Sequence, residues 1–228
     1  MQGVILAAGR GTRMGELSRA KPKPLLDVAG KTLLEHHFDA LEGVADEIII
    51  VIGYLGDQIK MCFGNHYQGI KLLYVEQKEL NGTAGALWQA RPLLHNSFLV
   101  MYADNIYFKE DVIAVSCNPW SVAGVEVDSL GGAARMIVND SDRVMDILEV
   151  GERDESPGFL NTGLYCLDMR VFDCKLVPKS RGSKEFGLPQ TLMKAAVPLL
   201  LVRTKFWIEI TSPGDLETAA KLLKKRHN

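Results

Sequence analysis

Short apolar runs alternate with helix-like stretches through the first half of the chain, and this alternation constrains the fold more than any other feature. The runs are rich in β-branched residues, and the stretches between them have helical spacing. Predicted strands cover residues 3–8, 47–52, 70–75 and 98–103, and predicted helices cover residues 32–41, 55–63 and 83–94. Such alternation predicts an α/β fold with a doubly wound, mostly parallel sheet flanked by helices on both faces.

The pattern changes after residue 120. Successive strands are predicted over residues 121–127, 133–138, 144–150 and 160–167, so the second half makes the sheet mixed. A last helix is predicted to begin after Thr211, with Ser212 as its cap and Pro213 in its first turn. Since no linker or internal repeat divides the 228 residues, we expect a single domain over residues 1–228.

Composition and charge narrow the class of partner. Hydrophobic residues make up 47% of the chain and charged residues 24%, which is typical of a soluble globular protein. With 26 basic and 28 acidic residues, the formal charge of −2 favours neither a nucleic acid nor a membrane as partner, so we expect a small molecule. The four cysteines are scattered without a CxxC pair, and the apolar run at residues 4–8 is too short for a signal peptide. A cytoplasmic protein is therefore expected.

A glycine-rich, basic loop follows the first predicted strand. Residues 9–15 are Gly-Arg-Gly-Thr-Arg-Met-Gly. Glycines let backbone N–H groups approach an anion, and arginines neutralise it, so the loop is a candidate phosphate site. A tight turn with solvated arginines is the alternative. The loop is not a dinucleotide-binding fingerprint because Gly15 comes one position late, and the Walker A pattern is absent.

A lysine stands between two prolines in Pro22-Lys23-Pro24. Each proline fixes its own φ and biases the residue before it away from helix, so the segment is predicted to be extended and to hold Lys23 in one direction. Beside a phosphate-type loop, this lysine is a candidate for anion binding. An exposed loop with an ordinary lysine is the alternative.

Two carboxylates follow apolar runs that are predicted to be buried strands. Asp104 comes after residues 98–103, and Glu209 comes after residues 206–208. Two hard oxygen ligands at one sheet edge suit Mg²⁺, which proteins usually hold with one or two carboxylates plus substrate phosphates. Both residues are predicted metal ligands, with solvated strand-end carboxylates as the alternative.

Gln77 and the turn at residues 81–84 lie between a predicted strand and a predicted helix. A glutamine amide at this point can bind the edge of a base, and Gly82 would let the base lie flat against the backbone. This part of the chain is therefore a candidate nucleotide site.

Several motifs occur together along nearly the whole chain. They are residues 6–14 (Leu-Ala-Ala-Gly-Arg-Gly-Thr-Arg-Met), residues 22–24 (Pro-Lys-Pro), residues 53–56 (Gly-Tyr-Leu-Gly), residues 82–87 (Gly-Thr-Ala-Gly-Ala-Leu), Asp104-Asn105 and residues 161–165 (Asn-Thr-Gly-Leu-Tyr). In this ordered set the chain resembles the sugar-phosphate nucleotidylyltransferases. The resemblance implies a nucleotide-diphospho-sugar transferase fold of the glycosyltransferase-A-like type. It also implies a nucleotide-binding half at about residues 1–115 and a sugar-phosphate-binding half at about residues 116–228.

The same resemblance implies roles for matching positions. Arg13 and Lys23 would be the catalytic cations, and Asp104 and Glu209 would hold Mg²⁺. Nucleotide contacts are implied for Leu6, Ala8, Gly9, Gly11, Thr12, Gln77, Gly82 and Thr83, and sugar contacts for Glu149, Asn161 and Thr162. The chain departs from the family in having Val150 where a lysine often follows the glutamate, and in having Glu209 where aspartate is usual.

The predicted reaction joins a nucleoside triphosphate to a sugar 1-phosphate and releases pyrophosphate. UTP or dTTP is the predicted nucleotide, because a glutamine amide matches one donor and one acceptor of a uracil or thymine edge. Two alternatives stay open: a cytidylyltransferase that acts on another phosphorylated alcohol, and a non-catalytic regulatory subunit that binds a nucleotide sugar. A homo-oligomer is compatible with the sequence.

Overall fold

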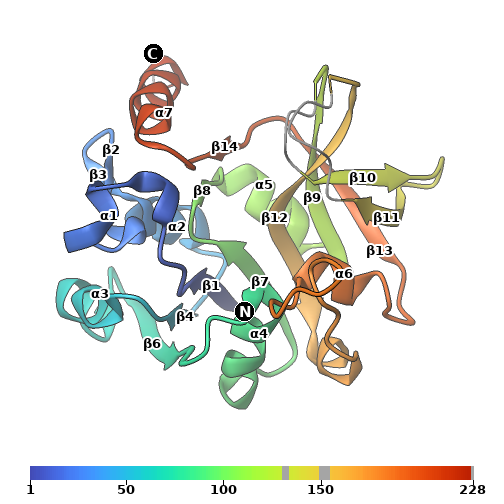
Figure 1. The fold of residues 1–228 in the computed structure, drawn as a ribbon, viewed down its shortest axis with the longest axis horizontal. Helices are drawn as coiled ribbons and strands as arrows, with labels where there is room; N and C mark the ends of the chain where they lie inside the picture. The colour runs from blue at the N-terminus through green and yellow to red at the C-terminus, as the bar shows by residue number, and fades with distance from the viewer. Residues whose placement is uncertain (130–133, 149–154, 227–228) are drawn as a thin grey trace.

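The computed structural model describes residues 1–129, 134–148 and 155–226, and its centre is a large sheet with helices on both faces (Figure 1). In the described residues, ten strands form this sheet in the order β10-β11-β13-β9-β12-β7-β1-β4-β6-β5. They are β1 (Gln2–Ala7), β4 (Glu47–Ile52), β5 (His66–Tyr67), β6 (Ile70–Glu76), β7 (Ser97–Tyr102), β9 (Ser121–Val127), β10 (Arg135–Val138), β11 (Arg143–Leu148), β12 (Gly158–Asp168) and β13 (Leu199–Thr204). Two short sheets pair β2 (Asp27–Val28) with β3 (Lys31–Thr32), and β8 (Asn105–Ile106) with β14 (Ile208–Glu209).

The helices lie between these strands in sequence. They are α1 (Leu17–Ala20), α2 (Leu33–Leu41), α3 (Gly56–Phe63), α4 (Gly82–Ala90), α5 (Lys109–Ser116), α6 (Leu188–Leu192) and α7 (Pro213–Arg226). Turns of 3-10 helix lie at Thr12–Met14, Lys23–Leu25, Arg91–Leu93 and Met169–Asp173. None of the helices in the described residues is both long enough and apolar enough to cross a membrane.

Four strands of the first half pair in parallel in the order β6-β4-β1-β7. Along β4, Ile49 and Val51 face the core that contains α4, while Ile48 and Ile50 face the core that contains α2, α3 and α5. Because both faces of these strands are covered, their sequences are continuously apolar rather than alternating. The predicted α/β fold, with helices on both faces of the sheet, is confirmed.

Strand β12 joins the two halves of the sheet. It pairs antiparallel with β7 on one side, where Leu164 lies opposite Met101, and antiparallel with β9 on the other, where Leu160 lies opposite Val125. Beyond β9 the sheet continues through β13, which is parallel to β9, and through the antiparallel strands β11 and β10. The second half therefore makes the sheet mixed, as predicted.

Local sequence signals explain where helix α2 begins and where helix α4 ends. Thr32 and Glu35 form the expected capping box of α2: the Glu35 N–H donates to Thr32 Oγ1 at 3.2 Å, and the Thr32 N–H donates to the Glu35 carboxylate at 2.7 Å. Helix α4 ends at Ala90, before the predicted residue 94, because Pro92 cannot continue the α-helical hydrogen bonds and the chain passes into a 3-10 turn.

Helix α7 begins at Pro213, as predicted, but its cap differs from the expected one. The Asp215 carboxylate accepts from the N–H groups of Thr211 (2.8 Å) and Ser212 (2.6 Å). Ala219 and Leu223 then pack the helix into a separate small core with residues of the β2–β3 hairpin and of β8 and β14. The last helix therefore lies beside the N-terminal part of the chain (Figure 1).

Candidate active site

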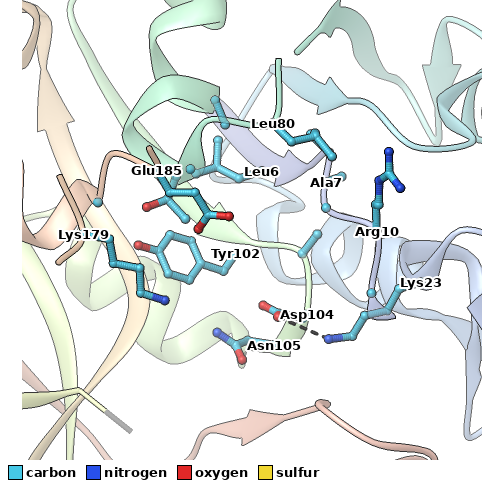
Figure 2. Close-up of a pocket in the computed structure, with 18 of the residues that line it drawn as sticks. Leu6, Ala7, Arg10, Lys23, Leu80, Tyr102, Asp104, Asn105, Lys179 and Glu185 are labelled. Carbon is cyan, nitrogen blue, oxygen red and sulfur yellow. Dashed lines mark hydrogen bonds and ion pairs between the residues drawn. The ribbon is translucent and has the colours of Figure 1, made fainter. Parts of the chain in front are cut away.

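A cavity of about 700 Å³ opens where strands β1, β6 and β7 end. Residues 6–13 enter it from β1, Gln77 from β6 and residues 102–105 from β7. Residues from the segments 179–190 and 207–211 also line it, and Lys179 and Glu185 face Arg10 and Lys23 across the cavity (Figure 2). Open α/β sheets bind ligands at the carboxyl ends of their strands, so this cavity is where a ligand site is expected.

The glycine-rich loop turns sharply out of β1. Gly11 has a left-handed backbone (φ 62°) at the start of the 3-10 turn, and Met14 anchors that turn in the core. A Cβ at Gly11 would lie 3.0 Å from the Cβ of Lys23, whereas a Cβ at Gly9 would meet no atom within 4 Å. Backbone geometry and packing therefore require glycine at position 11, while Gly9 leaves open space in which an anion can approach the backbone.

The motif at residues 53–56 packs against this loop on the side away from the cavity. A Cβ at Gly53 would lie 2.6 Å from the carbonyl oxygen of Ala8, and the N–H of Tyr54 donates to the same oxygen at 3.2 Å. The guanidinium of Arg10 lies 5.9 Å from the centre of the Tyr54 ring. The motif therefore positions the loop, and its own residues do not line the cavity.

Lys23 reaches from the loop side of the cavity to Asp104. Its Nζ donates to Asp104 Oδ2 at 3.2 Å, and the two side chains are 9% and 37% exposed (Figure 2). The backbone is extended at Pro22 (φ −65°, ψ 141°), but Lys23 itself begins a 3-10 turn. The prediction of a fully extended segment is wrong, yet the turn buries the lysine and directs its charge into the cavity.

Asp104 and Glu209 are brought together by the short strand pair β8–β14. Asn105 lies opposite Glu209 in this pair, and the N–H of Ile210 donates to the carbonyl oxygen of Asp104 at 2.8 Å. Glu209 therefore does not follow a buried strand over residues 206–208, as expected; it lies within the two-residue strand β14. Both carboxylates nevertheless line the cavity.

The pKa of Glu209 is raised above its ordinary value. The protein atoms packed around its carboxyl group desolvate it, although the side chain keeps an exposed surface, and the charge of Asp104 raises the pKa further. Arg13 and Lys23 act in the opposite direction. The two carboxylates thus repel each other at the cavity wall, which is the electrostatic condition that favours a cation between them.

Asn105 adds a third candidate oxygen ligand for a metal, next to Asp104 in sequence and opposite Glu209 in the β8–β14 pair. Asn105 is buried; its Nδ2 donates to the Thr162 carbonyl oxygen at 2.8 Å, while its Oδ1 has no hydrogen-bond donor in the described parts of the chain. Oxygen donors from Asp104, Asn105 and Glu209 fit the ligand preference of Mg²⁺. The described residues contain no cluster of three or more His, Cys, Asp or Glu side chains suited to a metal, so substrate phosphates would have to complete the coordination.

Gln77 lines the same cavity directly after β6, which is separated from β7 by β1 and β4 in the sheet. It is 4% exposed, and its Nε2 donates to Asn81 Oδ1 at 2.9 Å and to the Gly82 carbonyl oxygen at 3.1 Å. Both amide hydrogens are therefore used within the chain. The Gln77 atom that remains for a ligand is Oε1, which can only accept.

The turn at residues 81–84 is held by a segment about a hundred residues later in the chain. The N–H of Phe186 donates to the Asn81 carbonyl oxygen at 2.7 Å, and the Phe186 carbonyl oxygen accepts from the N–H of Ala84 at 3.0 Å. The N–H of Leu188 donates to Thr83 Oγ1 at 2.9 Å, across 105 positions in sequence. This wall of the candidate nucleotide site is therefore built from both halves of the chain.

The pairing of β12 with β9 is irregular between Asn161 and Tyr165, where the register shifts. Asn161 lines the cavity, and its Nδ2 donates to the hydroxyl of Tyr165 at 2.7 Å. Thr162 is buried behind the cavity, where its hydroxyl donates to the Ala123 carbonyl oxygen at 3.0 Å, and it does not line the cavity. Glu149, the remaining predicted sugar contact, lies outside the described residues.

The structure thus brings most of the predicted site residues around one cavity. They are Leu6, Ala8, Gly9, Gly11, Thr12, Arg13, Lys23, Gln77, Gly82, Thr83, Asp104, Asn161 and Glu209. Sequence reasoning missed the wall formed by Lys179, Glu185, Phe186 and Gln190, which has no motif of its own. It also missed Tyr102 and Trp207, although each stands two residues before a predicted metal ligand and could have been found from that position.

Known relatives cover the whole length of the chain. It is 30% identical to the UTP–glucose-1-phosphate uridylyltransferase AglF of Haloferax volcanii over 237 residues, which cover 99% of this chain and 97% of AglF. It is 28% identical to the bifunctional protein GlmU of Methanocaldococcus jannaschii over 231 residues, which cover 100% of this chain and 55% of GlmU. The chain therefore spans about half the length of this GlmU and nearly all of AglF.

Two solved structures share the fold. HddC from Yersinia pseudotuberculosis, complexed with GMP-PN, superposes with a TM-score of 0.77 at 26% identity, covering 97% of this chain and 99% of HddC. The inositol-1-phosphate CTP transferase from T. maritima superposes with a TM-score of 0.78 at 21% identity, covering 98% of this chain and 95% of that protein. At that identity the second likeness concerns the fold alone.

A family model places the N-terminal part of the chain among the nucleotidyltransferases. Residues 3–129, more than half of the 228 residues, match the model described as a MobA-like NTP transferase domain. The matched segment carries the glycine-rich loop, Lys23, the turn at residues 81–84 and Asp104. The nucleotidyltransferase resemblance expected from the sequence is confirmed, and the chain belongs to the MobA-like NTP transferase family.

Proposed function

We propose that this chain transfers a nucleotidyl group from a nucleoside triphosphate to a sugar 1-phosphate and releases pyrophosphate. One observation carries the proposal: a single cavity is lined by the glycine-rich loop with Arg13, by the Lys23–Asp104 pair, by Glu209 and by Gln77. The 97% coverage of AglF, a uridylyltransferase named for glucose 1-phosphate, supports a sugar 1-phosphate as the acceptor. We also propose that residues 1–228 form one domain, because one sheet takes strands from both halves.

Both reactants are anions, so the main task of the chain is to neutralise and align them. The N–H groups of residues 9–12 and the Arg13 guanidinium would hold the β- and γ-phosphates, and Lys23 would bind the phosphate nearest to Asp104. An oxygen of the sugar 1-phosphate then attacks the α-phosphorus in line with the bond to the departing pyrophosphate. The α-phosphate is transferred directly, and the reaction needs no covalent nucleophile from the chain.

Asp104 and Glu209, with Asn105 Oδ1 beside them, would hold Mg²⁺ in this site. When bound, the ion supplies positive charge for the phosphate oxygens during transfer. Lys23 shares the Asp104 carboxylate in this structure, so the lysine and the metal ligands would act on adjacent phosphate oxygens. The mutual repulsion of the two carboxylates supports this assignment.

UTP or dTTP remains the proposed nucleotide. Both hydrogens of the Gln77 amide are used within the chain, and its Oε1 can accept from the single N–H of a uracil or thymine edge. A guanine N–H could use the same oxygen, so Gln77 alone does not exclude GTP. The name of AglF, which specifies UTP for that relative, supports the pyrimidine assignment.

A matrix of four nucleoside triphosphates against a panel of sugar 1-phosphates, read out as released pyrophosphate with Mg²⁺ present, tests the proposal directly. We expect turnover with UTP or dTTP and at least one sugar 1-phosphate. Turnover with CTP and a phosphorylated alcohol that is not a sugar would instead support the cytidylyltransferase alternative. Binding of nucleotide sugars without pyrophosphate release from any pair would support the regulatory subunit.

Replacing Asp104 with asparagine separates catalysis from folding. Asparagine keeps an oxygen that can accept from Lys23 Nζ but removes the charge that a metal requires. We expect turnover to fall about 100-fold or more, the scale for removing one group that stabilises transition-state charge, while the unfolding midpoint in urea stays close to that of the wild type. Asp57→Asn is the matched control, since the Asp57 side chain is 90% exposed and does not line the cavity. Near-normal turnover of Asp104→Asn in saturating Mg²⁺ would remove Asp104 from the site.

A further inference from the structure

The wall opposite the glycine-rich loop carries a lysine in a rigidly placed hairpin. The N–H of Lys179 donates to the Glu185 carbonyl oxygen at 2.7 Å, and Pro178 forms a β-bridge with Phe186. Gly182, with a left-handed backbone (φ 81°), turns the chain between them. Because Phe186 is also hydrogen-bonded on both sides to the turn at residues 81–84, the backbone of Lys179 is fixed relative to the nucleotide side of the cavity.

The side chain of Lys179 extends into the cavity. Figure 2 shows it crossing from the left wall toward Tyr102 and Asn105, away from the backbone of its own hairpin. Across the described residues, its ammonium group makes no ion pair with a carboxylate, whereas Lys23 is paired with Asp104. Within the part of the chain that the structure describes, the Lys179 ammonium is therefore not held by a carboxylate, although the Glu185 side chain lies on the same wall, and it can bind an anion in the cavity.

The position of this charge differs from that of the other cations. In the described wall, the basic residues are Arg10, Arg13, Lys23 and Lys179. The first three belong to the segment that follows β1, and Lys179 faces Arg10 and Lys23 from the opposite side (Figure 2). In-line transfer at phosphorus places the attacking and leaving groups on opposite sides of the reacting atom, so the two anionic groups need positive charge from two sides.

We propose that Lys179 binds the phosphate of the acceptor and thereby restricts the reaction to phosphorylated acceptors. This inference rests on the proposed transfer from a nucleoside triphosphate. The loop side would neutralise the triphosphate, and the Lys179 ammonium would donate to the oxygens of the attacking phosphate. Lys179 is then a residue for acceptor affinity, and the nucleotide contacts do not depend on it.

Steady-state kinetics of Lys179→Ala test the assignment, with the most active nucleotide and sugar 1-phosphate of the wild type as substrates. We expect the KM for the sugar 1-phosphate to rise roughly 10- to 100-fold, the range for one charge-assisted hydrogen bond, with an unchanged KM for the nucleotide. Lys179→Arg should recover much of the acceptor affinity. Lys184→Ala is the matched control, because Lys184 belongs to the same hairpin and does not line the cavity.

Chemical modification gives a readout that does not depend on turnover. Acetylation of lysines, followed by peptide mass spectrometry, should show protection of Lys179 by glucose 1-phosphate but not by UTP alone, with Lys184 modified equally in both. An unchanged acceptor KM in Lys179→Ala, an equal rise in the nucleotide KM, or an equal loss in Lys184→Ala would overturn the assignment.

The proposed function can fail separately from this inference. A wild-type chain that uses only a phosphorylated alcohol other than a sugar phosphate would refute the sugar specificity alone. The same KM comparison, made with that acceptor, would then decide whether Lys179 binds its phosphate.

Discussion

Replacing Lys23 with methionine removes one charge from the cavity while keeping most of the apolar stem of the side chain. The lysine side chain is 9% exposed, its Nζ lies 3.2 Å from Asp104 Oδ2, and the Asp104 side chain is 37% exposed. The perturbation therefore leaves a carboxylate without its partner, but that carboxylate still has contact with water. Folding and catalysis depend on this charge to very different extents.

The expected loss of stability is small. An ion pair with one solvent-accessible partner contributes about 1 kcal/mol or less, because water screens the remaining charge. Methionine also removes the unfavourable burial of an ammonium group, which offsets part of the loss. In the proposed reaction the same charge would face phosphates in the cavity, where deletion of one transition-state charge donor costs about 2–4 kcal/mol in kcat/KM.

Pyrophosphate release and urea unfolding, measured on the same preparations, check both magnitudes. Lys21→Met is the matched control: Lys21 precedes the same Pro-Lys-Pro segment, is exposed and does not line the cavity. It should leave both quantities unchanged. The reasoning would be refuted if Lys23→Met retained wild-type kcat/KM, or if its loss of activity were matched by an equal loss of unfolding free energy.

Two further predictions concern backbone geometry and pH. Gly82 has φ 95°, and a Cβ there would lie 2.7 Å from the backbone nitrogen of Phe186, so Gly82→Ala should lower the unfolding free energy by about 2–3 kcal/mol. Gly43→Ala, at φ 74° with no atom within 4 Å, should cost only about 1 kcal/mol; equal losses in urea unfolding would rule out the contact with Phe186 as the cause. Burial lowers the pKa of His37 below the usual 6.5, so the unfolded chain takes up a proton that the folded chain resists as the pH falls. Stability should therefore fall below pH 6.5 by up to about 1.4 kcal/mol per pH unit, and His37→Gln, but not His36→Gln, should flatten this slope.

The first half of the fold could be predicted because its strands are covered on both faces. In β4, every residue from 48 to 52 is buried, so the run is apolar without interruption and stands out from the helices around it. Strand β13 did not stand out, because it follows another apolar stretch and its own pattern does not separate a strand from a helix. Helix α5 has only Val112 and Val115 buried, which is too few for a helical periodicity to be visible.

The candidate site also has one side that could be predicted from the sequence and one side that could not. Its loop side is encoded by short contiguous motifs, since a phosphate site needs glycines and cations at fixed spacing, and residues 9–13 supply them. The opposite wall depends on where the hairpin with Lys179 packs, and that position is set by hydrogen bonds to residues 81–84 rather than by any local pattern. Glu209 was predicted from its neighbours, and it lines the cavity, although the strand that carries it is a two-residue pair with β8.

The hydrogen bonds between Phe186 and the turn at residues 81–84 limit which segments of this chain can be exchanged with those of a relative. The family match ends at residue 129, yet the turn inside it completes its hydrogen bonds only with residues near 186. A chimera that joins residues 1–129 to the remainder of another family member would combine this turn with a segment whose backbone is positioned for the turn of that other protein. Recombination that preserves the geometry of this turn must therefore exchange residues 81–84 and 177–190 together, although they are about a hundred positions apart in the sequence.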